Sequence, residues 1–348
     1  MIRIGIIGTG GMAHDHARNY RKIKGVTLTA CCDINGERAR EFARMFSIPA
    51  SYPEYRQMLE CERLDGISIV TTDAFHAPIA IAALKKNIAV LCEKPMADSL
   101  ENARAMAEAA RASTAVSMIN FSKRNHYGLQ YAASWIKRGK IGRIMHVDAS
   151  YLQSWLVEKH WGDWRKSPAW LWRLSTKHGS MGVLGDLGCH IYDMASLLCD
   201  GFGSIFCTLG CFDKKAPGNR VGDYELDAND SFVSNVVFAN GALGSIHASR
   251  WATGHVNREY ISVFGDKGAV RVDMTHGIDQ CEIYDMKAKE WKSVKCPKTP
   301  SNYERFIKAI KTGVNDVSNF ENGLKIQAYL DSSVVSDTQK RPISMECA

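Results

Sequence analysis

The sequence predicts two domains, an α/β domain with a doubly wound parallel sheet and an α+β domain with a large, mostly antiparallel open sheet. Three observations lead to this prediction. The chain has 348 residues, more than the roughly 100–200 residues of one ordinary domain. Its first third alternates short β-branched runs with helical patterns, whereas strand-like runs separated by turn residues follow one another after residue 203. We expect domains at 1–120 and 121–348, with the C-terminal helices packing back toward the first domain.

Continuous apolar runs mark the strands of the first domain. The five clearest runs lie at 3–8, 26–33, 66–72, 88–93 and 114–120. Helical spacing of Ala and Met between strands is clearest at 101–113. Apolar strands alternating with helices indicate a parallel sheet that is covered on both faces.

The second domain begins with a helical pattern and then becomes rich in strands. A helix is expected at 129–139, a strand-like segment at 143–156, a Trp-rich irregular stretch after it, and a further helix through 185–193. Strand-like runs follow at 203–212, 230–238, 241–251, 259–273 and 280–286, and two helices at 302–313 and 320–339 close the chain. This succession favours an antiparallel sheet.

Composition excludes several classes of protein. The apolar fraction of 45% and charged fraction of 23% are those of a globular protein. The net charge of +7 is spread along the chain without a basic run, so we expect no nucleic-acid partner. No apolar run approaches the ~20 residues of a membrane span, and the N-terminus lacks a signal-peptide pattern. Eleven cysteines without a C-x-x-C pair indicate reduced thiols in a cytoplasmic protein and no structural zinc site.

A glycine-rich turn follows the first strand. G-T-G-G-M-A at residues 8–13 matches the G-x-G-x-x-G/A dinucleotide fingerprint of a Rossmann domain, so Gly8, Thr9, Gly10, Gly11 and Met12 are candidate cofactor-binding residues. The helix N-terminus after the turn can bind a pyrophosphate.

An acidic residue follows the second strand of this domain. Asp33 lies 20 residues after the fingerprint, where a carboxylate accepts hydrogen bonds from ribose hydroxyls and repels a 2′-phosphate. This favours NAD, with NADP less favoured. Arg38 is a further candidate because its guanidinium can soften this preference, although it can also lie on a solvated helix face.

Polar residues also follow two later strands, where an open α/β sheet binds ligands. Thr71 and Thr72 end the strand at 66–72, His76 follows it, and all three are candidate cofactor-binding residues. Glu93 and Lys94 follow the strand at 88–93 and are expected at the reactive end of the cofactor. In H-D-H at 14–16, His16 is expected to be packed or to face the cofactor.

The stretch G-D-L-G-C-H-I-Y-D at 185–193 carries three chemistry-bearing side chains. A helix through this stretch gathers Asp186, His190 and Asp193 within an arc of roughly 60°. These residues could hold a metal, move a proton or contact one another. The residue types and their spacing alone leave these three roles open.

The order of these motifs resembles one family. G-T-G-G-M-A, then E-K-P at 93–95, then G-D-L-G-C-H-I-Y-D is similar to the glucose-fructose oxidoreductase / inositol dehydrogenase / MocA family, and the resemblance extends to F-E-N-G-L-K at 320–325. It implies an NAD(P)-dependent oxidoreductase acting on CH–OH groups, with Lys94, Asp186 and His190 as the catalytic group and no metal. Thr72 and Asp73 depart from the Pro and Asn that relatives commonly carry there.

The resemblance and the aromatic content together indicate the substrate pocket. Five tryptophans fall at 155–172, where indole faces can stack on sugar rings or fill the core. N-F-S-K-R at 120–124 resembles a family segment from which Lys123 or Arg124 can reach the substrate. Candidate substrate-binding residues are Lys94, Arg124, Trp155, His160, Arg173, His178, Asp186 and His190. The substrate expected is a sugar, a sugar derivative or an inositol.

Three functions fit these features. The first is NAD(H)-dependent oxidation of a ring hydroxyl, in which His190 is the general base, Lys94 stabilises charge on the same oxygen and Asp186 contacts substrate or orients the pair. The second is redox-neutral glycoside cleavage through a transient keto sugar. The third is a non-catalytic ligand sensor. Relatives commonly pair through the open sheet, so the resemblance implies a homodimer or homotetramer.

Overall fold

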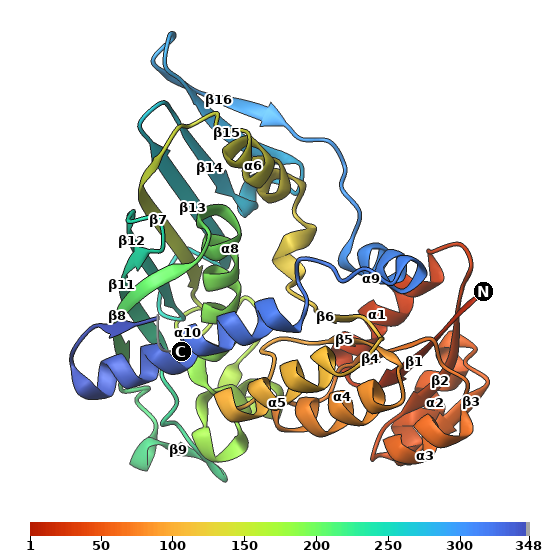
Figure 1. Ribbon diagram of the computed structural model, residues 1–348. Coiled ribbons are helices and arrows are strands. Elements are labelled where there is room, and N and C mark those ends of the chain that lie inside the picture. The colour runs from red at the N-terminus through yellow and green to blue at the C-terminus, as the bar shows by residue number, and fades with distance from the viewer. Residues whose placement is uncertain (346–348) are drawn as a thin grey trace. The chain divides into compact units, whose positions relative to one another are not determined.

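The computed structural model describes residues 1–345, and these form two compact units. Unit 1 consists of Met1–Ser122 and Pro300–Gln327. Unit 2 consists of Lys123–Thr299 and the described residues from Ala328 onward. The chain therefore leaves unit 1, builds most of unit 2, and returns to unit 1 before it ends in unit 2 (Figure 1).

Unit 1 contains a six-stranded parallel sheet. Its strands are β1 (Ile2–Ile7), β2 (Val26–Cys32), β3 (Ala50–Tyr52), β4 (Gly66–Ile69), β5 (Ala89–Cys92) and β6 (Ser117–Ile119). The spatial order is β3-β2-β1-β4-β5-β6, which is the doubly wound Rossmann order. This confirms the predicted parallel sheet. The order reverses between β1 and β4, and ligands of such sheets bind outside the strand ends at that point.

Helices connect these strands and cover the sheet. They are α1 (Gly11–Arg21), α2 (Gly36–Phe46), α3 (Tyr55–Cys61), α4 (His76–Lys85), α5 (Leu100–Arg111) and, from the returning segment, α9 (Asn302–Thr312). The start of α9 is fixed by a capping box, in which the Ser301 side chain accepts from the backbone of Glu304 and the Glu304 side chain accepts from the backbone of Ser301.

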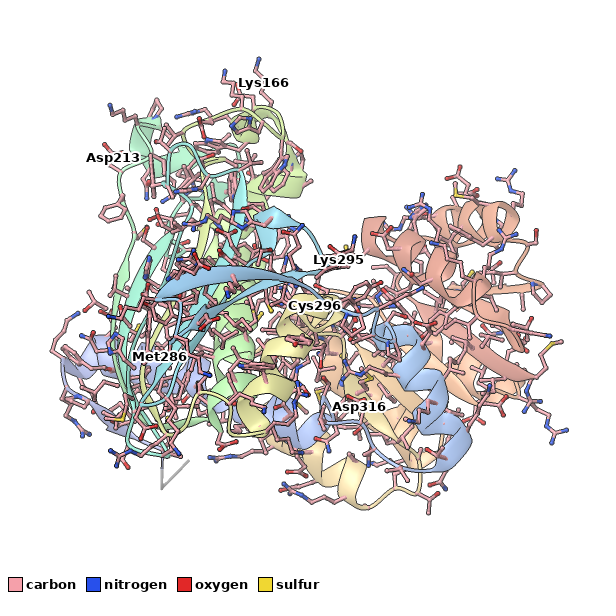
Figure 2. The ribbon with its side chains drawn as sticks, turned by 90° about the horizontal axis from the view of Figure 1, so that it is seen from above. Lys166, Asp213, Met286, Lys295, Cys296 and Asp316 are labelled. Carbon is pink, nitrogen blue, oxygen red and sulfur yellow. The ribbon has the colours of Figure 1, made fainter. Side chains whose placement is uncertain are left out.

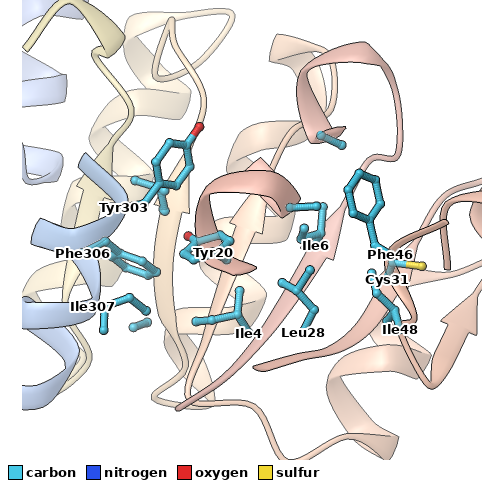
Figure 3. Packing of buried hydrophobic residues seen from close by; sticks show 14 of the residues in the cluster. Ile4, Ile6, Tyr20, Leu28, Cys31, Phe46, Ile48, Tyr303, Phe306 and Ile307 are labelled. Atoms are coloured by element: carbon cyan, nitrogen blue, oxygen red, sulfur yellow. The ribbon is translucent and has the colours of Figure 1, made fainter. Parts of the chain in front are cut away.

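The returning helix contributes to the core of unit 1. Tyr303, Phe306 and Ile307 of α9 are at most 5% exposed and belong to the same buried cluster as Ile4 and Tyr20. Figure 3 shows these side chains packed together. Burying three large side chains stabilises unit 1 by about 1.5–3 kcal/mol each, so α9 is an integral part of this unit.

Unit 2 contains a nine-stranded sheet. Its strands are β7 (Ile144–Gln153), β8 (Phe202–Gly210), β11 (Ser231–Phe238), β12 (Leu243–Ser249), β13 (Asn257–Gly265), β14 (Ala269–Asp273), β15 (Gln280–Asp285), β16 (Glu290–Lys295) and β17 (Ile343–Ser344). The order is β16-β15-β14-β13-β7-β12-β11-β8-β17. β7 and β12 pair in parallel, and the other neighbours pair antiparallel. The predicted, mostly antiparallel open sheet is confirmed.

Helices pack on one face of this sheet. The helices that lie wholly in unit 2 are α6 (Tyr127–Lys137), α7 (Pro168–Leu171) and α8 (Cys189–Cys199), and α10 (Phe320–Gln339) ends in it. The Tyr192 hydroxyl of α8 lies within hydrogen-bonding distance of Ser234 of β11 and Ser333 of α10. The side chains of β11 alternate between buried and exposed, so every second residue of that strand faces away from these helices.

Short irregular elements fill one end of unit 2. Single 3-10 turns lie at Trp164–Lys166, Trp172–Leu174 and Thr176–His178, and a small ribbon pairs β9 (Arg220–Val221) with β10 (Tyr224–Glu225). Lys166 and Asp213 lie at this end of the unit (Figure 2). No helix within residues 1–345 is long and apolar enough to cross a membrane.

Five strands and one helix start differ from the prediction. The sequence analysis did not predict the short or polar strands β3, β9, β10, β16 and β17. The predicted helix through residues 185–193 begins with a π-helical turn at Leu184–Gly188 and becomes α-helical only from Cys189. The side chains from Asp186 onward therefore do not follow the 100° spacing of one continuous α-helix.

Candidate active site

The glycine-rich turn has the conformation that a dinucleotide needs. Gly8 has φ +88°, and a Cβ there would lie 2.5 Å from the carbonyl oxygen of Val70, so only glycine fits. A Cβ on Gly10 or Gly11 would meet nothing within 4 Å. Within the described residues, no side chain caps the N-terminus of α1, whose N-cap is Gly10. Together with the exposed Met12, this leaves backbone donors open to a pyrophosphate.

Asp33 lies buried beside this turn. Its carboxylate accepts hydrogen bonds from the Thr9 backbone (2.8 Å) and Thr9 hydroxyl (2.9 Å), from the Asn35 backbone (2.9 Å) and from two nitrogens of Arg38 (2.6 and 3.0 Å). Burial raises the pKa of Asp33, but these hydrogen bonds outweigh it and the net pKa is lowered. The carboxylate is therefore charged at neutral pH.

Arg38 is paired with Asp33, so it does not lie on a separate solvated face. Its side chain is half exposed, so it covers Asp33 from the solvent side. A neutral dihydroxyl can donate to the carboxylate, whereas a phosphate would meet its negative charge.

His76 is fully buried and fixes two strand ends. Its Nδ1 lies 3.0 Å from the carbonyl oxygen of Pro95 and its Nε2 lies 3.2 Å from that of Thr71. A neutral imidazole has one N–H and can donate to only one of these carbonyls. These contacts give His76 a role in holding the segments after β4 and β5, while Thr72, ahead of a 3-10 turn at Asp73–Phe75, is exposed.

Glu93 is the centre of a buried hydrogen-bond network. Its Oε1 accepts from His16 Nε2 (2.9 Å) and from Asn120 Nδ2 (2.6 Å), and its Oε2 accepts from the backbone of Lys94 (3.2 Å). Asn302 of α9 donates to Asn120 Oδ1 (2.9 Å). Burial raises the pKa of Glu93, but the hydrogen bond and charge of His16, with Asn120 and Lys94, lower it overall.

This network places the backbone of the E-K-P motif. Lys94 follows β5 directly and is half-buried, with its backbone held by Glu93. His16, an expected packed or cofactor-facing residue, has its Nε2 on Glu93 and is fully buried. The Thr71, His76, Glu93 and Lys94 candidates thus all lie after β4 or β5 of unit 1.

In unit 2, Asp186 lies between two arginines. Its Oδ2 accepts from Arg250 Nη2 at 3.1 Å and lies 3.7 Å from Arg173 Nε. The Arg250 side chain is 0% exposed, whereas those of Asp186 and Arg173 are 28% and 30% exposed. Asp186 is therefore a charged hydrogen-bond acceptor at the accessible side of a buried cation.

His190 lies in the same unit beside Tyr151. The two rings are 6.3 Å apart, and both residues are 5% exposed. Burial raises the pKa of Tyr151 well above its usual value, and the charges of Glu259 and Asp186 act in the same direction. Tyr151 is therefore protonated at neutral pH, and its hydroxyl donates to Asn257 at 3.1 Å.

Lys123 completes this cluster. It forms an ion pair with the buried Glu259, and its ammonium lies 5.1 Å from the centre of the Tyr151 ring. The sequence analysis named Lys123 as an alternative to Arg124 in reaching the substrate. The structure places Lys123 at the Tyr151 cluster.

Arg124 and Asp193 pair with each other instead. Arg124 is 2% exposed and donates to both carboxylate oxygens of Asp193 at 2.7 Å. This ion pair is buried within unit 2, and the contact of Arg124 with substrate stays a prediction. No group of three or more His, Cys, Asp or Glu residues within 1–345 is arranged to hold a metal ion.

The remaining substrate candidates have different surroundings. Trp155 is 3% exposed and lies in a core cluster with Leu156 and Trp164, with the Arg250 guanidinium 5.1 Å from its ring. His160 is exposed and pairs with Glu158 at 3.3 Å. His178 is exposed and lies against Tyr224. Of the group, Arg173 and Trp155 lie at the Asp186–Arg250 pair.

Sequence reasoning missed the residues that surround Asp186 and His190. Arg250 is the only arginine in the run at 241–251. Tyr151, Asn257 and Glu259 stand at strand positions whose neighbours are set by the pairing of β7 with β13. Glu259 is the residue that could have been singled out from the sequence, because an acidic side chain in a strand needs a charged partner when it is buried.

Two protein-family models match most of this chain. Residues 2–121 match the family model described as "Oxidoreductase family, NAD-binding Rossmann fold", and residues 129–271 match "GFO/IDH/MocA C-terminal domain". Levoglucosan dehydrogenase of Pseudarthrobacter phenanthrenivorans is 29% identical over 290 residues, which cover 77% of this chain and 73% of that protein. Myo-inositol 2-dehydrogenase of Thermotoga maritima is 26% identical over 78% of this chain and 75% of that protein.

Solved structures extend the likeness to the whole chain. The structure named "Levoglucosan dehydrogenase, complex with NADH and levoglucosan" has a TM-score of 0.88 at 25% identity and covers 99% of both chains. The structure of an oxidoreductase domain protein from Kribbella flavida has a TM-score of 0.89 at 26% identity and covers 99% of this chain and all of that one. The chain therefore belongs to the glucose-fructose oxidoreductase / inositol dehydrogenase / MocA family and is an NAD-dependent oxidoreductase acting on CH–OH groups.

Proposed function

We propose that this protein moves hydride between NAD and a secondary ring hydroxyl, or the matching ketone, of a sugar, a sugar derivative or an inositol. The observation that carries the proposal is the His190 cluster, in which a shielded imidazole lies with Tyr151 and Asp186 in unit 2. The names of the relatives, which include levoglucosan and myo-inositol dehydrogenases, support this class of substrate.

NAD accepts hydride at nicotinamide C4, and this chain supplies its binding groups. Gly8, Thr9, Gly10, Gly11 and Met12 form the pyrophosphate turn. Arg38 moves aside, and the Asp33 carboxylate then accepts hydrogen bonds from the ribose hydroxyls. Thr71, Thr72, Glu93 and Lys94, with His76 holding the backbone, form the part after β4 and β5 that we assign to the nicotinamide end.

The proton of the substrate hydroxyl is handled by two residues in this proposal. His190 takes the proton as general base during oxidation and returns it as general acid during reduction. Lys94 donates to the same oxygen and stabilises the negative charge that develops on it. Asp186 accepts a hydrogen bond from a neighbouring substrate hydroxyl and so orients the ring. The partly exposed Arg173 lies beside Asp186.

The test is absorbance at 340 nm with NAD or NADP against a panel of sugars, anhydrosugars, glycosides and inositols. Steady NADH formation with one class of ring is the expected result. Lys94→Ala and His190→Ala should each lower kcat by about 100-fold or more while NADH binding survives. Unchanged turnover in both variants would refute the assignment of the proton to these residues.

Two other outcomes of the substrate panel would indicate a function other than a dehydrogenase. Cleavage of a glycoside without net NADH would indicate the redox-neutral route through a transient keto sugar. Binding of a sugar by an NAD-loaded protein that neither oxidises nor cleaves it would indicate a sensor. The cluster at His190 favours the dehydrogenase because sensing requires no shielded base.

We further propose that two copies of the chain pair through the open sheet of unit 2. Phe206, Val233, Val237, Leu243 and Phe264 are 36–57% exposed and lie on β8, β11, β12 and β13 of one sheet. Val237 is directly opposite Leu243, and exposed apolar patches mark association sites. Light scattering should give the mass of a dimer or tetramer, which Val237→Asp with Leu243→Asp should reduce. A monomeric wild-type protein at micromolar concentration would overturn this proposal.

A further inference from the structure

The buried arginine behind Asp186 has no role in the chemistry described so far. Arg250 follows β12, is 0% exposed and donates to Asp186 Oδ2 at 3.1 Å. Its Nη1 donates to the carbonyl oxygen of Arg173 (3.0 Å), and the Nη2 that contacts Asp186 also donates to the carbonyl oxygen of Gly182 (3.5 Å). The Trp155 ring lies 5.1 Å from the centre of the guanidinium. Arg250 is thus held on several sides and has little freedom to move.

Because Arg250 is buried, its positive charge needs a carboxylate nearby to stabilise it. Arginine stays protonated in proteins, and a buried cation needs a carboxylate to compensate the water it has lost. Burial lowers the pKa of Arg250, and the charge of Asp186 raises it. Asp186 is the partly accessible end of this pair, since its side chain is 28% exposed.

A second buried pair lies behind Arg250. The side chains of Lys214 and Asp230 are both 0% exposed, with Lys214 Nζ 2.7 Å from Asp230 Oδ2. The backbone amide of Arg250 donates to the backbone carbonyl of Asp230 at 2.9 Å. The negative charge of the Asp230 carboxylate also raises the pKa of Arg250. Charges therefore alternate from Lys214 to Asp230, Arg250 and Asp186, and the array stabilises a negative charge at its accessible end.

We propose that Arg250 is a positioning residue that holds the Asp186 carboxylate in one orientation, so that Asp186 presents a fixed acceptor to a substrate hydroxyl. This inference rests on the function proposed above, in which Asp186 contacts the substrate. Asp186 belongs to a π-helical turn, so the regular hydrogen bonding of an α-helix does not fix it. The guanidinium donates from a rigid planar fork, and its other contacts to the backbone at Arg173 and Gly182 set where that fork points.

A double-mutant cycle separates this role from a purely structural one. Arg250→Gln and Asp186→Asn are made singly and together, and kcat/KM is measured with the substrate that the panel identifies. If Arg250 acts through Asp186, R250Q lowers kcat/KM by about 10- to 100-fold in the wild-type background and by less than about 3-fold in the D186N background. Equal factors in both backgrounds would overturn the proposal.

Arg124 provides the matched control. It is as buried as Arg250 but pairs with Asp193, so Arg124→Gln should change kcat/KM by the same factor with or without D186N. Arg250→Lys keeps the charge and loses the planar fork, so it should recover part of the activity that R250Q loses. R250K also serves in the cycle if R250Q does not fold.

The same variants report the pairing without any substrate. D186N leaves Arg250 buried without its carboxylate, so it should lower the Tm more in the wild-type background than in the R250Q background. Additive Tm changes would overturn the coupling of Arg250 with Asp186 whatever the panel shows. A silent panel with coupled Tm changes would overturn the proposed dehydrogenase alone.

Discussion

Replacement of Glu93 by Gln tests the buried network that carries the E-K-P motif. The Glu93 carboxylate accepts from His16 and Asn120 at Oε1 and from the backbone of Lys94 at Oε2. Glutamine has one carbonyl oxygen. If this oxygen keeps the hydrogen bonds from His16 and Asn120, the amide NH₂ of the glutamine faces the backbone N–H of Lys94. That N–H then has no acceptor.

The magnitude follows from this count. Losing one hydrogen bond to a charged group costs about 1.5–3 kcal/mol. For a unit of this size, about 2–4 °C in Tm corresponds to each kcal/mol, so E93Q should lower the Tm of the protein by about 3–12 °C at pH 7. Circular dichroism or scanning calorimetry measures the change.

The effect should depend on pH in a defined direction. The pKa of Glu93 is lower in the folded protein than its ordinary value. The network therefore stabilises the fold at pH values above the unfolded pKa of about 4.3, and this stabilisation is lost as the pH falls through the lower folded pKa. The Tm difference between wild type and E93Q should be largest near pH 7 and should shrink below about pH 4.

Glu37 is the control for this experiment. Its side chain is 78% exposed and pairs with Arg40 at the surface, so Glu37→Gln should leave the Tm unchanged at both pH values. An E93Q variant as stable as wild type at pH 7, or one with the same deficit at both pH values, would refute the reasoning about the network.

Three further changes test other parts of the fold and site. Gly8→Ala places a Cβ 2.5 Å from the Val70 carbonyl at φ +88°, so it should weaken NADH binding by at least about 10-fold; a fluorescence titration with unchanged affinity would contradict the assigned turn. Asp33→Ser removes the charge that opposes a 2′-phosphate, so the NAD to NADP ratio of kcat/KM should fall by about 10-fold or more, and a constant ratio would show that another group sets the preference. Asp230→Asn leaves Lys214 buried without its counter-charge and should destabilise unit 2 by about 3–5 kcal/mol, which denaturant unfolding would detect.

Local sequence patterns predicted most of the fold. Long apolar runs and the glycine turn predicted β1, α1 and β2 because their signals are contained within a few residues. β3 (Ala50–Tyr52) has three residues and no apolar run, and β16 (Glu290–Lys295) is a polar edge strand. Both exist because a neighbouring strand offers hydrogen bonds, which a reading of the segment alone does not show.

The candidate site was predictable where one motif holds its residues together. Asp186 and His190 lie in a single stretch, but their surroundings come from distant strands. Arg250 reaches Asp186 across 64 positions of sequence, and Tyr151 meets Glu259 through the pairing of β7 with β13. Arg124 and Lys123 are adjacent in sequence, and only tertiary packing decides which one is buried against Asp193.

The return of the chain to unit 1 has a consequence for synthesis. Unit 1 needs Tyr303, Phe306 and Ile307 to complete its core, and these residues leave the ribosome after nearly all of unit 2. A nascent chain of 122 residues therefore has the six parallel strands and the glycine turn but lacks the helix that covers Ile4 and Tyr20. Such a fragment exposes apolar surface until translation passes α9, so a premature stop within unit 2 should yield an aggregating or degraded product in place of a free nucleotide-binding domain.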